Sequence, residues 1–365
     1  MSNVDGLLLA CAHLPQNDDS RLAQHLASFA AWDALLPAAE TQGLGPLLYA
    51  HMRRAAFDPP PAVRLGLQGM FLRARHWHEV AQAVVGDALQ AAQQADVPLV
   101  VLKGMALASV VYPEPALRPM RDVDVLVSSA DEPRLRRALA DWGFSPLASG
   151  PIPPDHRHGV GLARTVDGAV VQLELHHNLF SGFMAGDSLT LADVAAWLRP
   201  FYLGDQQAFT LDHEVMLWHL YRHMIVEPWR LIRLVDLVAY AEKFSGRINW
   251  ARLRRRYPLV APALALLHGI TPLSAQLQAR SGINPTFTLA LTEIPRDWPP
   301  LGDACWAEMG WWQRARALFF PQPASLSLYY GIKSQNELAW QRWLRHPMQV
   351  GVWIMRRVVW GQSRS

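Results

Sequence analysis

The chain has 365 residues, of which 51% are hydrophobic and only 18% charged, a composition that excludes a disordered protein and allows two or three packed units. Its formal net charge of +3 permits a phosphate-bearing ligand but does not require nucleic acid. The two cysteines, Cys11 and Cys305, make neither a disulfide framework nor a zinc signature.

Residues 1–95 are predicted to be helical. A proline run, Pro59–Pro61, breaks the chain, and apolar residues then recur at roughly helical spacing over Ala62–Ala95. The sequence therefore predicts one long helix before the character of the chain changes at Val97.

The next segment alternates short strands with short helices. Val97–Leu102 is a continuous apolar run typical of a buried strand, Gly104 ends it, and Met105–Val111 indicates a short helix. Asp122–Val127 alternates acidic and apolar residues before it becomes fully apolar, as in a strand with one solvated end. A further helix is predicted over Asp131–Trp142.

A hairpin signal follows. Two alternating runs, Gly159–Val166 and Ala169–His176, flank Asp167-Gly168, a pair that favours a tight primed turn. From about Leu189 the chain is predicted to be mostly helical, with one long helix over Asp212–Phe244.

The order of these elements predicts the fold class α+β. A small sheet layered with helices is expected in the strand-bearing segment. The expected division is an N-terminal helical region over 1–95, a core over 96–188 and a C-terminal helical region over 189–365.

Asp122 and Asp124 are the first candidates for chemistry. Side chains alternate across a strand, so two residues that are two positions apart point to the same side. Their like charges repel by roughly 1 kcal/mol or more, a cost that a divalent cation between them would remove. Hard Mg²⁺ prefers carboxylates, waters and phosphate oxygens as its ligands.

Glu174 is a third candidate, because it lies on a strand whose opposite face is apolar. If that strand lies beside the strand of Asp122, the three carboxylates form one site. Such a site can hold two metals about 3.5–4 Å apart for in-line phosphoryl transfer.

Lys103 and Gly104 separate the first strand from a short helix. A glycine there lets the backbone approach a phosphate, and the start of the helix offers free N–H groups. Lys103 can add a point charge, and Arg118 and Arg121 stand just before the aspartates, where they could also contact phosphates.

Three runs carry a specific resemblance: Leu102-Lys103-Gly104, Arg118–Val127 and Leu173-Glu174-Leu175-His176. Together with Tyr112-Pro113 they resemble the uncharacterised bacterial nucleotidyltransferases of the DNA polymerase β-like superfamily. His223, Trp229, Asp236 and Ile248-Asn249-Trp250 are similar to the family's helical C-terminal region. The similarity covers about residues 95–260.

This resemblance implies a core of mixed sheet and helices that transfers a nucleoside monophosphate from an NTP, expected to be ATP, with Mg²⁺ or alternatively Mn²⁺. It implies that Asp122 and Asp124 hold both metals, that Glu174 binds the second metal and helps activate the acceptor hydroxyl, and that Gly104 lies under the triphosphate. One residue departs from the pattern: Met105 follows Gly104, where the superfamily usually has Gly or Ser.

The histidines allow a second reading as metal ligands. His156, His158, His176 and His177 lie near the site in sequence, and His219 and His223 are four residues apart on a helix. We expect structural or supporting roles for them. His176 is singled out because it shares a strand face with Glu174.

Two basic segments have alternative interpretations. The run Arg252–Arg256 suits a solvated helix end or an RNA contact. The C-terminal Trp and Arg residues suit either helix packing, which we expect, or peripheral contact with a membrane surface. No apolar run reaches the ~18 residues that span a bilayer, so no transmembrane segment is expected and the expected location is the cytoplasm.

The sequence thus predicts a metal-dependent nucleotidyltransferase. Its acceptor stays open among a small molecule, a saccharide, a peptide and an RNA end, because fold and core do not fix function. Two alternatives are a regulatory module that binds nucleotide without turnover and a toxin-like transferase that modifies RNA or protein.

Overall fold

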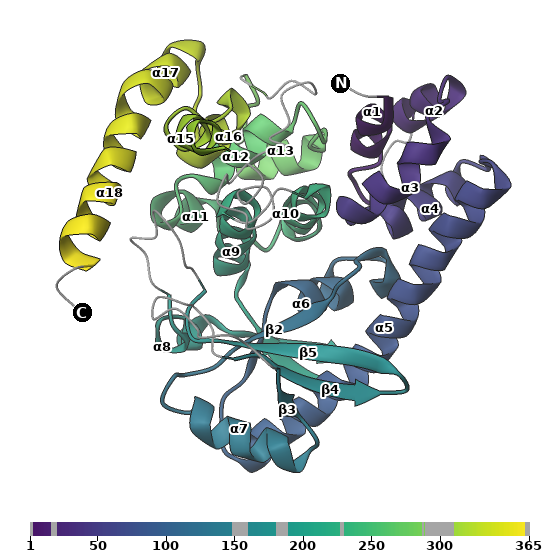
Figure 1. The fold of residues 1–365 in the computed structure, drawn as a ribbon, viewed down its shortest axis with the longest axis vertical. Helices are drawn as coiled ribbons and strands as arrows, with labels where there is room; N and C mark the ends of the chain where they lie inside the picture. Colours follow the sequence, from purple (N-terminus) through teal and green to yellow (C-terminus); the bar gives the residue numbers. More distant parts are fainter. Residues whose placement is uncertain are drawn as a thin grey trace. The chain divides into compact units, whose positions relative to one another are not determined.

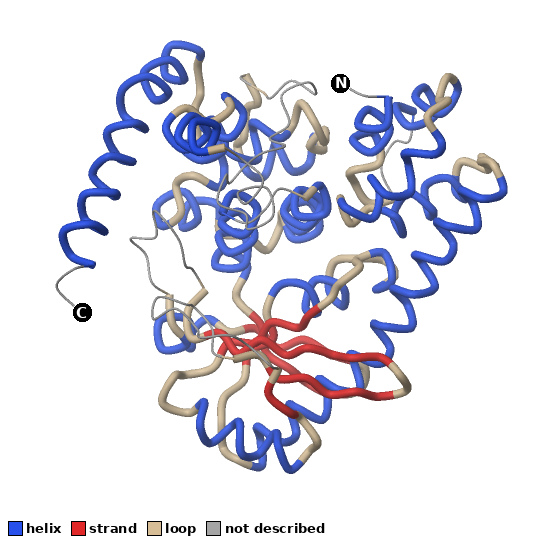
Figure 2. The backbone as a smooth tube through the Cα atoms, in the orientation of Figure 1, coloured by secondary structure: helices blue, strands red, loops and turns tan. Residues whose placement is uncertain are grey.

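The structure is a computed structural model that describes residues 3–15, 20–147, 160–179, 189–226, 230–286, 288 and 310–361. Its internal contacts divide the chain into two compact units, residues 2–219 and residues 220–365. Figures 1 and 2 show that the strands belong to the first unit.

The first unit begins with five helices: α1 (Asn3–Ala10), α2 (Ser20–Ala27), α3 (Trp32–Thr41), α4 (Gly45–Arg54) and α5 (Pro61–Gln94). The long helix predicted after the proline run is confirmed as α5. Pro60 has an extended backbone and Pro61 takes the first helical position, where the missing N–H costs nothing.

A mixed sheet of seven strands follows. The strands are β1 (Val100–Val101), β2 (Asp122–Leu126), β3 (Ser145–Pro146), β4 (Leu162–Val166), β5 (Ala169–His176), β6 (Arg199–Leu203) and β7 (Gln206–Thr210), in the spatial order β3-β4-β5-β2-β1-β7-β6. β2 pairs parallel with β5 and β1 parallel with β7, and the other pairs are antiparallel. The predicted α+β class with a mixed sheet is confirmed.

Helices cover both faces of this sheet. They are α6 (Lys103–Val110), α7 (Glu132–Asp141) and α8 (Leu191–Val194), with 3₁₀ turns η1 (Pro115–Leu117) and η2 (Ala195–Trp197). α5 contacts α7, β4 and β5, whereas α6 contacts β2, β6 and η1. Figure 1 shows α6 and α7 on opposite sides of the strands. The apolar face of the central strands is fully buried, as at Val123, Val125 and Leu175.

The predicted hairpin is confirmed. Val166 pairs with Ala169, and the two residues between them, Asp167 and Gly168, have φ values of 49° and 76°. Both central residues of a type I′ turn need positive φ, which Asp and Gly tolerate best. This turn sets the register that places Glu174 on its strand.

Two strands were missed by the sequence analysis. β6 and β7 lie beyond residue 188, so the sheet extends past the segment 96–188 in which strands were expected. β6 contains Pro200, which has no N–H for a ladder and is tolerated because β6 is an edge strand. Buried side chains alternate with more exposed ones in both strands, as in Phe201 and Leu203, but the runs are too short and polar to stand out.

The single helix predicted over Asp212–Phe244 is wrong. The chain forms α9 (His213–Val226) and α10 (Leu231–Phe244). Asp212 caps α9 by accepting a hydrogen bond from the N–H of Val215 at 2.8 Å. Arg230 has an extended backbone (φ −135°, ψ 137°), so a new helix begins at Leu231.

The second unit is helical in its described residues. After α10 it contains α11 (Trp250–Arg256), α12 (Val260–Leu267), α13 (Ala275–Ser281), α15 (Trp311–Phe319), α16 (Pro323–Tyr330) and α17 (Gln335–Trp340), then a π-helical turn η4 (Gln341–Arg345) that continues into α18 (His346–Gly361). Within the described ranges, no helix combines the length and apolarity that crossing a bilayer requires.

The packing of the C-terminal helices on the catalytic domain, which we expected, stays a prediction. Four of their tryptophans are exposed. Trp311, Trp312, Trp340 and Trp343 are 67%, 70%, 51% and 60% exposed. The sequence cannot separate these positions from buried ones, because both the buried and the exposed side of this helical segment carry apolar residues. The basic run on α11 is exposed at Arg254, Arg255 and Arg256, as expected for a solvated helix end.

Candidate active site

The parallel pairing of β2 with β5 builds the site. In register, Asp122 lies opposite Gln172, Asp124 opposite Glu174 and Leu126 opposite His176. Side chains at matching positions of paired strands share a face, so Asp122, Asp124, Glu174 and His176 project from one side of the sheet. The condition on which the three-carboxylate hypothesis depended, adjacent strands, is therefore met.

Asp124, Glu174 and His176 form the tightest group. One donor atom from each lies within 4.8 Å of the other two. His176 Nε2 lies 2.7 Å from Asp124 Oδ1 and 3.6 Å from Glu174 Oε2. The side chains of Asp124 and His176 are 5% and 2% exposed, whereas that of Glu174 is 28% exposed and so stays accessible to a ligand.

Lys103 brings a second positive charge to Asp124. Its Nζ lies 3.2 Å from Asp124 Oδ1, and the Lys103 side chain is buried. The backbone fixes this approach, because the N–H of Leu102 donates a hydrogen bond to the carbonyl of Asp124 at 2.9 Å. Lys103 then begins α6 directly, two residues earlier than the helix start predicted at Met105. Lys103 and Gly104 thus lie in the first turn of α6.

The ionisation of the site reflects this arrangement. Burial raises the pKa of Asp122, and the neighbouring charge of Asp124 raises it further, while Lys103 opposes the shift. For His176, burial alone would lower the pKa, but hydrogen bonds with Asp124 and Glu174 outweigh it and raise the pKa above its usual value. The two carboxylates therefore favour the protonated form of His176, which in turn would supply positive charge to them.

Gly104 lets the arginine-containing loop close against the start of α6. A Cβ atom built on Gly104 would lie 2.8 Å from Met120 Sδ and 3.6 Å from a guanidinium nitrogen of Arg118. Arg118 is buried there and donates a hydrogen bond to the carbonyl of Pro119 at 3.0 Å. Of the two arginines expected to contact phosphates, Arg118 lies beside Lys103 and Gly104, whereas Arg121 is exposed at the start of β2.

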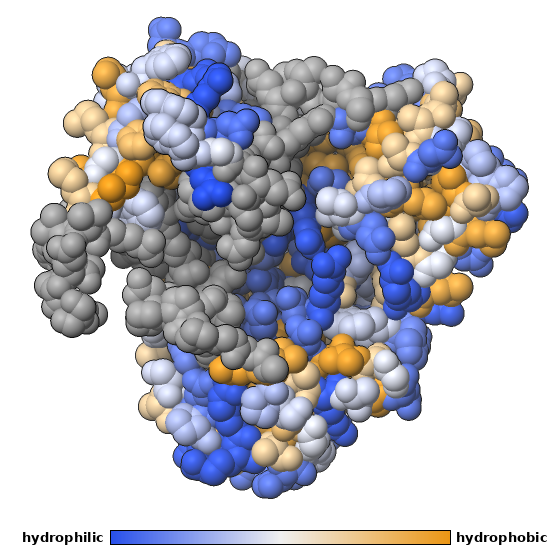
Figure 3. All heavy atoms as spheres, viewed as in Figure 1, coloured by the Kyte–Doolittle hydropathy of each residue, from blue (hydrophilic) through white to orange (hydrophobic). Residues whose placement is uncertain are grey.

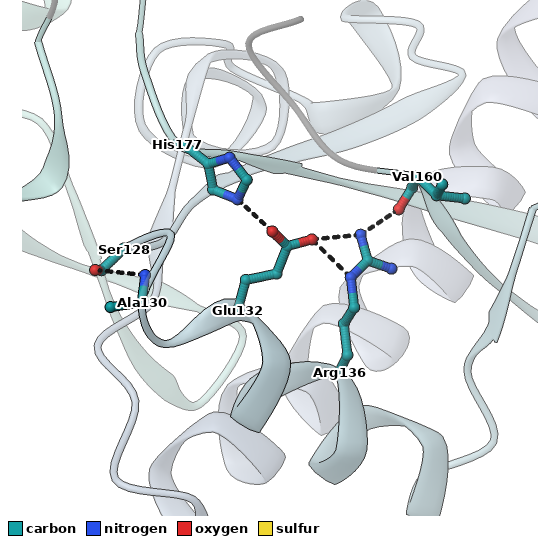
Figure 4. Close-up of polar contacts among 6 residues, drawn as sticks. All are labelled: Ser128, Ala130, Glu132, Arg136, Val160 and His177. Carbon is teal, nitrogen blue, oxygen red and sulfur yellow. Dashed lines mark hydrogen bonds and ion pairs between the residues drawn. The ribbon is translucent and has the colours of Figure 1, made fainter. Parts of the chain in front are cut away.

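A second polar network holds the end of β5 on the face opposite the carboxylates (Figure 4). His177 follows His176 and lies 2.5 Å from Glu132 Oε2, at the first residue of α7. Arg136 donates to the other oxygen of Glu132 at 2.6 Å and also to the carbonyl of Val160, just before β4. The two adjacent histidines thus contact different partners: His176 contacts the carboxylate site, and His177 contacts Glu132 on α7.

Sequence reasoning missed part of this arrangement. The Glu132–Arg136 pair has an i,i+4 signal on a helix, but nothing in the sequence links it to His177. His156 and His158, two of the histidines considered as metal ligands, lie outside the described residues. His219 and His223 are buried in α9, as their expected structural role requires.

The donor set suits a divalent cation. Carboxylate oxygens are the ligands that Mg²⁺ and Mn²⁺ prefer, and an imidazole nitrogen in the same set also suits a transition metal. The compact group contains His176 where the sequence analysis expected Asp122. Asp122 projects from the same strand face, so its place among the metal ligands, with Asp124 and Glu174, stays a prediction.

Comparison with known proteins assigns this chain to a family. The pattern of the family described as uncharacterised nucleotidyltransferase matches residues 28–270, which is more than half of the chain. The chain belongs to this family. No curated protein matches it. The solution structure of the antibiotic-resistance factor ANT(2'')-Ia matches 49% of this chain and 94% of its own, at 13% identity and a TM-score of 0.34.

The adjacent histidines provide a matched test of the metal ligands. His176→Gln should weaken Mn²⁺ binding by about 10- to 100-fold, because it removes a nitrogen donor and the hydrogen bond that orients Asp124. His177→Gln should leave Mn²⁺ binding within about threefold of wild type, since His177 supplies no donor to the carboxylate site and the glutamine amide can still donate a hydrogen bond to Glu132. Electron paramagnetic resonance of free Mn²⁺ measures both. An equal loss in the two variants would show that His176 acts only through the stability of β5.

Asp122 should oppose folding of the metal-free nucleotidyltransferase. Its pKa is raised in the folded state, so its ionised form is disfavoured there, and the cost is present above the folded pKa and disappears as pH falls through it. Asp122→Asn should therefore raise the free energy of unfolding at neutral pH by roughly 1 kcal/mol with chelator present. The gain should vanish in acid.

Thermal unfolding across a pH series measures this difference. Added Mn²⁺ should reverse the order of stability, because the wild type, with Asp122 as a further ligand, binds it more tightly and gains more from binding. A variant that is less stable than wild type at neutral pH in chelator would contradict the account of Asp122.

Proposed function

We propose that this chain is an active metal-dependent nucleotidyltransferase that moves a nucleoside monophosphate from an NTP, ATP in the first instance, to an acceptor hydroxyl. The observation that carries the proposal is the register of Asp124 with Glu174 on adjacent parallel strands, with Asp122 on the same face and Lys103 against Asp124. A sheet face with three acidic side chains is costly in a folded protein unless positive charge offsets it, and a divalent cation can add to the charge that Lys103 and His176 supply.

Asp122, Asp124 and Glu174, with His176 beside them, are the residues that would hold Mg²⁺ or Mn²⁺. When bound, a divalent cation at such a site neutralises charge on the transferred phosphate and lowers the pKa of the attacking oxygen, and two such cations would stabilise both the attacking and the leaving oxygens.

The start of α6 suits the triphosphate. Lys103 and Arg118 both lie there, and the first N–H groups of a helix attract anions. Arg118 can bind two phosphate oxygens at once, whereas Lys103 acts as a point charge. Exposed Arg121 can contact the part of the nucleotide that faces solvent. These groups hold the nucleotide so that its α-phosphorus lies near the carboxylates.

Glu174 is the proposed base. It is the most exposed side chain of the compact acidic group, and so the one that an acceptor can reach. The acceptor oxygen attacks the α-phosphorus, the bond from that phosphorus to the bridging oxygen breaks, and pyrophosphate leaves. The hydroxyl proton passes to the Glu174 carboxylate. His176, 3.6 Å away, orients that carboxylate.

Pyrophosphate release from labelled ATP tests the proposal. Small-molecule, saccharide, peptide and RNA fractions serve as acceptors, with Mn²⁺ or Mg²⁺. Glu174→Gln should lower turnover by about 10²- to 10⁴-fold, the range for loss of a general base, and Asp124→Asn should abolish it. Glu79→Gln is the matched control, because Glu79 is an exposed glutamate on α5.

Two results would revise the proposal in different ways. Turnover that survives Glu174→Gln but not Asp124→Asn would remove Glu174 as the base and keep the transferase. Tight metal-dependent ATP binding with no pyrophosphate release from any acceptor fraction would instead favour a regulatory nucleotide-binding module. Growth arrest on expression, relieved by Asp124→Asn, would identify a toxin-like transferase.

A further inference from the structure

The C-terminal helix presents a continuous apolar stripe to solvent. Trp340, Leu344, Met348, Val352 and Met355 recur at spacings of four, four, four and three residues along α17, η4 and α18. All five are exposed, Met348 by 69%. Such spacing places side chains on one side of a helix. Figure 3 shows apolar side chains gathered over the helix that Figure 1 labels α18.

The opposite side of the same helix is buried and makes hydrogen bonds within the second unit. Gln341, His346 and Val350 are buried, and His346 Nε2 lies 2.9 Å from the carbonyl of Leu318 at the end of α15. Tyr330 bonds both His346 and Gln349. The helix is therefore anchored by one side, and the exposed stripe is not needed for that anchoring.

Two stacked tryptophans are a second exposed apolar feature of this unit. Trp311 and Trp312, at the start of α15, have ring centroids 4.0 Å apart and are 67% and 70% exposed. α15 contacts α18. A pair of exposed stacked indoles and an exposed apolar stripe on contacting helices exceed the scattered single apolar residues that are normal on a protein surface.

Arginines border this surface. The guanidinium of Arg345 lies 5.7 Å from the ring centroid of Trp340, and that of Arg342 lies 5.2 Å from the ring centroid of Trp343. Of the chain's 34 Lys and Arg residues, eight fall in residues 310–365, whereas only one of its 31 Asp and Glu residues does. This segment therefore carries a formal charge of +7 although the chain carries +3, so the remainder of the chain is net negative.

We propose that the apolar stripe on α17, η4 and α18, with Trp311 and Trp312, binds the surface of an anionic phospholipid bilayer. The apolar side chains enter the boundary between headgroups and acyl chains, the indoles lie at headgroup depth, and Arg342 and Arg345 contact lipid phosphates. The net positive charge of residues 310–365 favours an anionic bilayer as the partner of this surface. A second copy of the chain would bring two segments of +7 together, which their repulsion opposes. The proposal does not rest on the transferase activity.

Co-sedimentation with vesicles tests the proposal on the full chain. The wild type should sediment with vesicles of phosphatidylcholine mixed with phosphatidylglycerol and far less with pure phosphatidylcholine, and added salt should weaken the binding. Met348→Glu/Val352→Glu should reduce binding about tenfold or more, because both changes place charge in the stripe. Leu65→Glu, on α5 and similarly exposed at 62%, is the matched control and should bind as wild type does.

Arg342→Gln/Arg345→Gln provides a second variant that leaves the stripe intact. It should retain the helical circular dichroism of wild type and lose the preference for anionic vesicles. The proposal is overturned if the wild type sediments with neither vesicle, or if the stripe variant binds as tightly as wild type. It is also overturned if the wild type elutes as a dimer that Met348→Glu/Val352→Glu converts to a monomer, because a second copy then covers the stripe.

Discussion

The neutralisation of Asp124 is the interaction on which the rest of the site depends. Its carboxylate is 5% exposed and has Asp122 and Glu174 on the same face of the sheet. A buried carboxylate is costly unless it is paired and hydrogen-bonded. Lys103 and His176 meet that need from two directions, one from the start of α6 and the other from the end of β5. The sheet and the first turn of α6 are thereby linked through a single oxygen atom, Asp124 Oδ1.

This arrangement suits metal binding because a cation can replace the positive charges of His176 and Lys103 at Asp124. A protonated imidazole and a lysine satisfy Asp124 without a metal, and an incoming cation would take over the same oxygen. Ligands must be deprotonated to bind a metal, so binding releases a proton from His176 wherever that group is charged. Lys103 would then be available to a phosphate. The charge of a bound nucleotide would then be coupled to the charge of the site through Asp124.

His176 and His177 have different partners because successive side chains of a strand point to opposite faces. His176 and His177 are neighbours in sequence but belong to different networks, one with Asp124 and the other with Glu132. The α7 anchor fixes the end of β5 (Figure 4), and the hairpin turn at Asp167 and Gly168 fixes its beginning. A slip of one residue would turn Glu174 away from Asp124. The carboxylate site therefore depends on residues that never contact a ligand.

Much of the site could be predicted from sequence because its signals are local. The spacing of Asp122 and Asp124, the Asp-Gly turn and the alternation through Glu174 all depend on strand geometry within a few residues. Contacts between distant segments could not be predicted. Nothing local shows that Lys103 pairs with Asp124, nor that His177 turns to Glu132.

Other features of the fold could not be predicted, each for a physical reason. β6 and β7 are short, and an edge position tolerates Pro200, which masks the strand pattern. The helix expected over Asp212–Phe244 is divided because the backbone at Arg230 is extended. The exposure of Trp340 and Trp343 was not predictable because the apolar residues of the last helix belong to two surfaces, one packed and one open to solvent.

Calorimetric titration of ATP, with and without Mn²⁺, into the wild type and into Asp122→Asn/Asp124→Asn shows whether nucleotide binding depends on the metal and on the β2 carboxylates. If the carboxylates on β2 form a metal-dependent nucleotide site, the wild type binds ATP only with the metal and the double variant does not bind it. If the wild type binds no nucleoside triphosphate with Mn²⁺ or Mg²⁺, or if the double variant binds as tightly as wild type, the site does not serve nucleotide transfer.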